Sequence, residues 1–235
     1  MRLIRALKKL KAFQGLTEQE LAWVLYDVGN SAYTMLACSL IPIWFKSIAV
    51  GHAPGQISSD NATAYYSLAI SIVTVAVALL GPVLGALADH KDKKRMYFTS
   101  AAALGMIFCV LTGFAWSWLL FLILFVVTKI CYSASLTIYD SMLGDITTED
   151  RMDEVSSNGF AWGYLGSCIP FLIALIAYVL GPDMVGLIPA LLSRGIGVFV
   201  TAAWWLMVTV PLLLDYTQKN YSSGESASVG AAFRK

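Results

Sequence analysis

The sequence has little charge and few of the residues from which enzymes build metal or catalytic sites. Asp, Glu, Lys and Arg together make up 13% of the 235 residues, whereas hydrophobic residues make up 58%. A soluble domain carries about 25% charged residues, so the composition excludes that class. The four cysteines show no CxxC spacing, and the only histidines, His52 and His90, fall in loops predicted on opposite sides of a membrane. We therefore predict no metal site, disulfide frame, cofactor or enzymatic activity.

What the sequence does have is six long apolar runs separated by polar connections. Each run is about 20 residues or longer, which as an α-helix rising about 1.5 Å per residue crosses the ~30 Å hydrocarbon core of a bilayer. The runs predict an all-α membrane protein with six transmembrane helices. They cover residues 21–45, 64–88, 96–114, 118–143, 157–180 and 188–214.

Most basic residues lie in connections that are predicted on the same side of the membrane. Short cytoplasmic loops are enriched in Lys and Arg, so this bias predicts that both termini are cytoplasmic. The basic residues are spread over several loops, and no nucleic-acid partner is predicted. Thirteen of the sixteen lie on the predicted inner side: Arg2, Arg5, Lys8, Lys9, Lys11, Lys91, Lys93, Lys94, Arg95, Arg151, Lys219, Arg234 and Lys235.

The spans divide the chain into three parts. Residues 1–20 combine apolar residues at helical spacing with basic ones, which favours an amphipathic helix on the inner leaflet over a solvated basic tail. Residues 21–214 form the bundle, and residues 215–235 read as a polar cytoplasmic linker or tail. The longest predicted connections are an outside loop at 46–63 and an acidic inside loop at 144–154.

Four charged residues inside the spans, Asp27, Lys129, Asp140 and Arg194, need an explanation, because charge in hydrocarbon is costly and usually faces a bundle interior or a wet cavity. In the first span Asp27, Asn30 and Ser31 share one helix face, and in the fourth Lys129 and Asp140 do the same. We interpret these five residues as candidates for a solute or ion path. Structural roles remain open for the charged ones: an interfacial carboxylate, a buried ion pair or a charge at a helix end.

Glycines repeat at close spacing in two spans. Gly81 and Gly85 lie four residues apart in the second, and Gly159, Gly163 and Gly166 line one side of the fifth. Such faces let helices approach closely in lipid, so both predict helix packing.

The connection between the second and third spans carries a motif. Residues 85–95 (GALADHKDKKR) resemble the signature loop of the major facilitator superfamily, G-x-L-A-D-R-x-G-R-K-R. His90 stands where that pattern has Arg, and Asp92 stands where it has Gly. The motif lies at the predicted inside end of the second span, where the family has it.

Two further stretches resemble one branch of that superfamily, which contains the autophagy-related vacuolar amino-acid effluxer and its bacterial relatives. They are residues 23–32 (WVLYDVGNSA) and residues 139–166, which include YDSMLGD at 139–145. The branch usually has Asn where Asp140 stands and Pro where Gly144 stands. These motifs specify a family and not a substrate.

The resemblance implies a secondary active transporter that moves amino acids or similar small solutes by alternating access, coupled to a proton or cation. It implies that the first and fourth helices line the central cavity, and that Gly85, Asp89 and Arg95 belong to an inside gate. It also implies a multi-pass protein, in the plasma membrane if the source is bacterial.

The superfamily normally has twelve helices in two halves, and this chain shows one half, a 3+3 inverted repeat. Three explanations remain open: a fragment or split transporter, a homodimer of halves, or a non-transporting membrane subunit or scaffold that needs a partner half.

Overall fold

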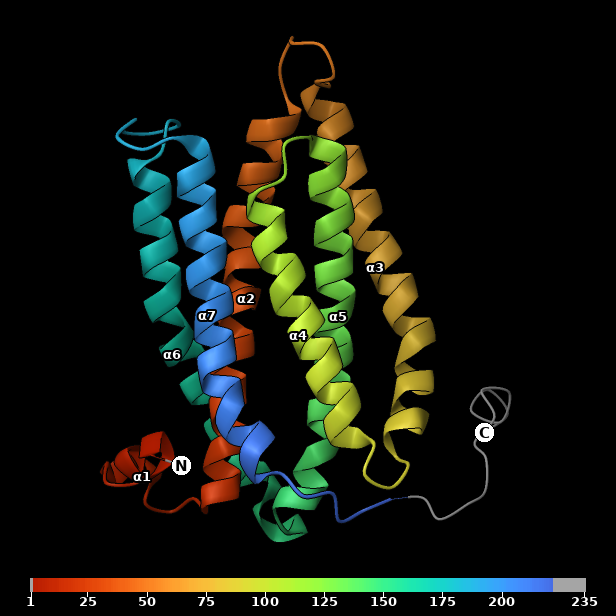
Figure 1. Cartoon of the computed structure of the whole chain (residues 1–235), viewed down its shortest axis with the longest axis vertical. Coiled ribbons are helices and arrows are strands. Elements are labelled where there is room, and N and C mark those ends of the chain that lie inside the picture. The colour runs from red at the N-terminus through yellow and green to blue at the C-terminus, as the bar shows by residue number, and fades with distance from the viewer. Residues whose placement is uncertain (1, 222–235) are drawn as a thin grey trace.

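The structure, a computed structural model, describes residues 2–221 and consists of helices standing side by side along one long axis (Figure 1). Within these residues six helices are long and apolar enough to cross a membrane, which confirms the predicted fold class. They are α2 (Glu18–Ala49), α3 (Ser59–Ala88), α4 (Lys94–Gly113), α5 (Trp118–Ile146), α6 (Met152–Leu180) and α7 (Ala190–Asp215).

Short elements accompany the bundle at one end. The helix α1 (Arg2–Leu7) and the 3-10 turn η1 (Lys11–Phe13) precede α2, and the turn η2 (Glu149–Arg151) leads into α6. The helix α1 and the end of α7 lie at the same end of the bundle (Figure 1). The cytoplasmic placement of that end stays a prediction. Most of the predicted polar tail, residues 222–235, lies outside the described part of the chain.

Two predicted loops are shorter than expected, because helices continue beyond their apolar stretches. The connection between α2 and α3 covers only residues 50–58, since Ser58 caps α3 by accepting a hydrogen bond from the Asn61 amide at 3.3 Å. At the other end of the bundle α5 runs on to Ile146, which places Gly144 and Asp145 in a helix. Hydropathy identifies the part of a helix that contacts lipid, whereas the residue at which the helix begins or ends depends on capping and on polar contacts.

The helix α2 lies at the centre of the packing and contacts α5, α6 and α7. The glycines of α6 allow this closeness: a Cβ at Gly163 would lie 2.9 Å from the Ser31 hydroxyl oxygen, and one at Gly166 would clash with Val28. The predicted packing role of the α6 glycines is therefore confirmed.

The corresponding prediction for α3 is wrong within the described chain. A Cβ at Gly81 or Gly85 would meet nothing within 4 Å. The reason is that α3 is the least buried of the six helices and lies at one edge of the bundle, with α6 at the other (Figure 1). Large apolar side chains on both edge helices are exposed, among them Leu68, Val75, Leu79, Leu165 and Ile176.

Candidate functional site

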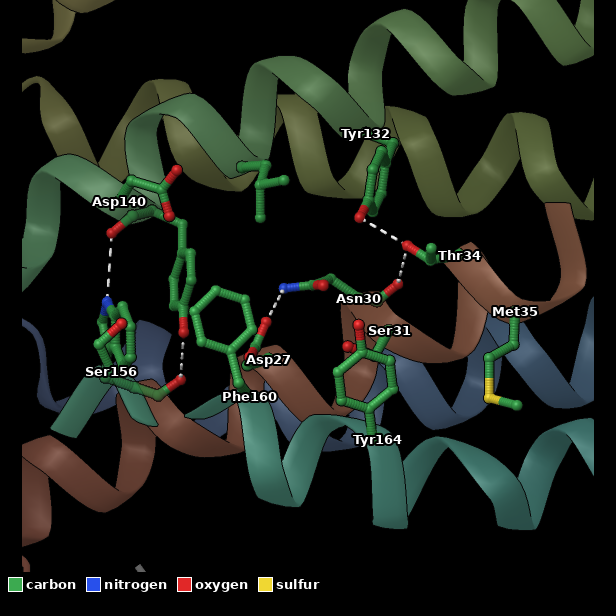
Figure 2. A pocket seen from close by; sticks show the side chains of 13 residues that line it. Asp27, Asn30, Ser31, Thr34, Met35, Tyr132, Asp140, Ser156, Phe160 and Tyr164 are labelled. Carbon is green, nitrogen blue, oxygen red and sulfur yellow. Dashed lines mark hydrogen bonds between the residues drawn. The ribbon is translucent and has the colours of Figure 1, made fainter. Parts of the chain in front are cut away.

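A polar cavity of about 270 Å³ lies between α2, α5 and α6 (Figure 2). The helices α2 and α5, which carry the two predicted polar stripes, provide most of its lining. The lining residues are Trp23, Asp27, Asn30, Ser31, Thr34, Met35, Tyr132, Leu136, Tyr139, Asp140, Ser156, Phe160 and Tyr164.

Asp27 is the most enclosed carboxylate of this cavity, with 8% of its surface exposed. Its Oδ1 accepts a hydrogen bond from Asn30 Nδ2 at 3.0 Å, one helical turn along α2, and Asn30 is itself buried. Its Oδ2 faces α6, where a Cβ on Gly163 would lie 3.1 Å away. The small residue on α6 thus leaves room beside the carboxylate.

The structure brings four of the five predicted path residues together. Asp27, Asn30 and Ser31 approach from α2, and Asp140 from α5, where its side chain is exposed toward the opening. The fifth, Lys129, is not in this cavity. Both carboxylates therefore share one polar space without a basic side chain beside them.

Lys129 lies in a second cavity of about 660 Å³, formed by α2, α3 and α5 and lined mainly by apolar side chains. Its Nζ is 4.8 Å from the centre of the Tyr132 ring and 5.7 Å from that of Tyr33, both cation–π distances. It forms no salt bridge with any of residues 2–221. Tyr132 also lines the first cavity, so the same side chain borders the carboxylate-bearing space and contacts the Lys129 ammonium.

Aromatic residues that the sequence did not single out hold the wall of the first cavity. The rings of Trp23 and Tyr139 stack at 4.3 Å, and each side chain donates a 3.2 Å hydrogen bond to the other's backbone carbonyl. The hydroxyls of Tyr132 and Thr34 lie 2.7 Å apart. Helical spacing from the carboxylates could have indicated two of these residues, because Trp23 lies four positions before Asp27 and Tyr132 lies eight positions before Asp140.

The predicted gate residues lie at the end of the bundle where α3 gives way to α4. Asp89 is exposed and 3.9 Å from Lys94 Nζ, while Arg95 is exposed and has no ion pair within the described residues. Asp92 takes a φ of +60°, so the turn keeps the left-handed backbone for which glycine is favoured, with an aspartate in place of the motif's glycine.

The buried ion pair of this region joins Lys94 to Asp145 at 3.1 Å, with 3% and 0% of the two side chains exposed. Asp145 also accepts hydrogen bonds from the Tyr216 hydroxyl and from the amides of Lys219 and Asn220. Burial and the bond to Asp145 hold the pKa of Tyr216 well above its usual range. Sequence reasoning missed this cluster, although both charged residues lie in the stretches that carry the family resemblance.

A second ion pair, with a buried carboxylate and an arginine side chain that is 34% exposed, joins α2 to the turn before α6. Glu20, with 2% of its side chain exposed, accepts hydrogen bonds from Arg151 Nε at 3.0 Å and from the Thr147 hydroxyl at 2.7 Å. Arg151 also donates to the Gly15 carbonyl at 2.9 Å. The segment before α2 is thereby held against the bundle, where Phe13 packs on Trp162 with ring centres 4.6 Å apart.

Six helices long enough to span a membrane, with a carboxylate-bearing cavity between α2, α5 and α6, define a multi-pass membrane protein. The chain belongs to the Major Facilitator Superfamily, whose sequence model matches residues 29–229. This is a family of transporters and not of enzymes.

Among known proteins, the chain is 35% identical over 222 residues to one from Bacillus subtilis (strain 168) named uncharacterized MFS-type transporter YxiO. The match covers 93% of this chain and 51% of the relative, so the chain spans about half the length of the curated relative it matches. No solved structure matches.

Proposed function

We propose that the chain forms the N-terminal half of a secondary active transporter that moves amino acids or similar small solutes by alternating access. The observation that carries this proposal is the cavity in which Asp27, Asn30, Ser31 and Asp140 meet. Transporters of this architecture bind solute and coupling ion between two halves, near the middle of the bilayer. The amino-acid class comes from the motif resemblance alone.

In this proposal each polar residue has a role set by its position. Asp27 is nearly enclosed, and its Oδ2 accepts no hydrogen bond from any of residues 2–221; it takes the coupling proton or cation. Asn30, Ser31 and Asp140 contact the solute. Lys129 lies in the second cavity, on the face that a partner half would cover. There it contacts the solute or the partner's helices.

The inside gate is proposed at the α3–α4 turn. Gly85, Asp89 and Arg95 are open to a partner on the side that the described residues leave uncovered. The buried ion pair between Lys94 and Asp145 joins α4 to α5 next to this turn. The turn and these two helices would therefore move together.

A second six-helix half, either a separate polypeptide segment or another copy of this chain, is the proposed partner. The exposed apolar residues of α6 lie beside the carboxylate cavity and those of α3 beside the Lys129 cavity, and lipid alone would leave the carboxylates beside acyl chains. A covering half would enclose them in an aqueous path.

The test replaces Asp27 by Asn in the full assembly reconstituted in vesicles. We expect gradient-driven solute uptake to be lost while insertion and assembly are unchanged, because the amide cannot take up a proton or balance a cation. The exposed Asp60→Asn at the outer end of α3 is the matched control and should transport normally. Uptake by Asp27→Asn that still follows an imposed proton gradient would refute the coupling role. An intact assembly with no uptake of any solute would favour the non-transporting subunit.

A further inference from the structure

We infer that the cavity between α2, α5 and α6 recognises its solute through a protonated amino group and makes no ionic contact with a solute carboxylate. The substrate class would then be amines with an apolar body, for which an amino acid's carboxylate is dispensable. This inference rests on the proposed function and deepens it: the Asp27 carboxylate would bind the coupling ion and the solute ammonium in turn, in the same cavity.

The first argument is charge. The lining contains two carboxylates, Asp27 and Asp140, and no Lys, Arg or His among the described residues. The nearest cation on the same helices, Lys129, lies in the other cavity with its ammonium over the Tyr132 ring. A charge moved from water into such a space needs an opposite charge or several hydrogen bonds, and only a cation finds the opposite charge here.

The second argument is an unused acceptor. Asn30 occupies Oδ1 of Asp27, whereas Oδ2 receives no hydrogen bond from any of residues 2–221 although more than nine-tenths of the residue is buried. Figure 2 shows Asp27 between Asn30 and the Phe160 ring, within the cavity. As part of the cavity lining, this carboxylate oxygen can accept a hydrogen bond from a bound molecule, and an ammonium group supplies both donor and charge.

The third argument separates an amine from a bare metal ion. Five aromatic residues line the cavity, and two of them, Phe160 and Tyr164, stand at its edge with 63% and 70% of their surfaces exposed. Aromatic faces attract an organic cation and cover its apolar body. A metal ion would need clustered ligands, and in the described part of the chain no three His, Cys, Asp or Glu residues are arranged to hold one.

The experiment measures binding to the purified full assembly in lipid nanodiscs by titration calorimetry. The probes share a ring and differ in charge: 2-phenylethylamine, phenylalanine and 3-phenylpropionate. The full assembly is used because a cavity without its covering half would face acyl chains. We expect 2-phenylethylamine to bind at least as tightly as phenylalanine, and 3-phenylpropionate to bind about tenfold more weakly or not at all.

Variants assign the binding to this cavity. Asp27→Asn should weaken 2-phenylethylamine binding about tenfold or more, while the exposed Asp60→Asn should leave it unchanged. Phe160→Leu is a second variant that keeps the fold intact because the ring is exposed, and it should weaken the amine about threefold through loss of the cation–π contact.

The outcomes distinguish this inference from the transport proposal. Binding of 3-phenylpropionate as tight as that of the amine, or no amine binding by the folded assembly, overturns amine recognition even if vesicles containing the assembly take up another solute. Amine binding that depends on Asp27, together with no uptake by the assembly, supports the recognition and contradicts the transport proposal alone.

Discussion

At the scale of single residues, the strongest polar contacts lie at the end of the bundle that carries the gate motif. Asp145 is fully buried and receives the Lys94 ammonium, the Tyr216 hydroxyl and two backbone amides. Every one of these groups donates, so a carboxylate is the side chain that can satisfy them together. One residue thus joins α4, α5 and the segment after α7.

Replacing Asp145 by Asn should lower the free energy of unfolding by about 3 kcal/mol, because Lys94 is left as an uncompensated buried charge. Thermal unfolding in detergent measures this change. Asp183→Asn, at an exposed position in the α6–α7 connection, is the control and should change stability little. Adding Lys94→Met to Asp145→Asn should restore part of the loss. If the double variant is no more stable than Asp145→Asn alone, the ion pair is not the cause.

At the scale of elements, α6 and α3 show opposite uses of glycine. The α6 glycines meet α2 directly, whereas Gly81 and Gly85 of α3 face open space in the described chain. The same spacing therefore means packing in one helix and an uncovered face in the other.

Gly166→Ala should destabilise the chain by about 1–3 kcal/mol, because the added methyl group would overlap the Val28 side chain. Gly85→Ala is the matched variant and should stabilise the isolated chain slightly, since alanine favours the helix and its methyl group meets nothing. Both are compared by thermal unfolding in the same detergent. Equal effects of the two substitutions would contradict the packing described for α6.

The element scale also shows what the sequence could predict and where it fell short. Hydropathy located all six spans because crossing a bilayer demands about 20 apolar residues. It misjudged the 144–154 loop because the helical state of Asp145 depends on Lys94 and Asn220, partners distant in sequence. Helical periodicity placed Asp27 with Asn30 and Ser31, but periodicity describes one helix at a time. It could not separate Lys129 from Asp140, which share α5 yet border different cavities.

At the scale of the whole molecule, both cavities are built on the same two helices, and each is completed by one exposed edge helix. The helices α2 and α5 contribute to both, α6 borders the carboxylates and α3 borders Lys129. The polar residues are thus distributed across one broad face whose margins are apolar. This distribution fits a face that is covered by further protein around a water-accessible centre.

Water access to that face distinguishes a carrier half from a bundle surrounded by lipid. In a background with the four native cysteines changed to alanine, Ser31→Cys and Ser133→Cys report on the two cavities, and Phe199→Cys, exposed on α7, reports on the lipid side. We expect a charged, water-soluble thiol reagent to modify the two cavity cysteines in membranes holding the full assembly, and to leave Phe199→Cys unmodified. The reagent needs a thiolate, which forms in water and not among acyl chains. If Ser31→Cys and Ser133→Cys were as unreactive as Phe199→Cys, the polar face would border lipid, and transport through it would be ruled out.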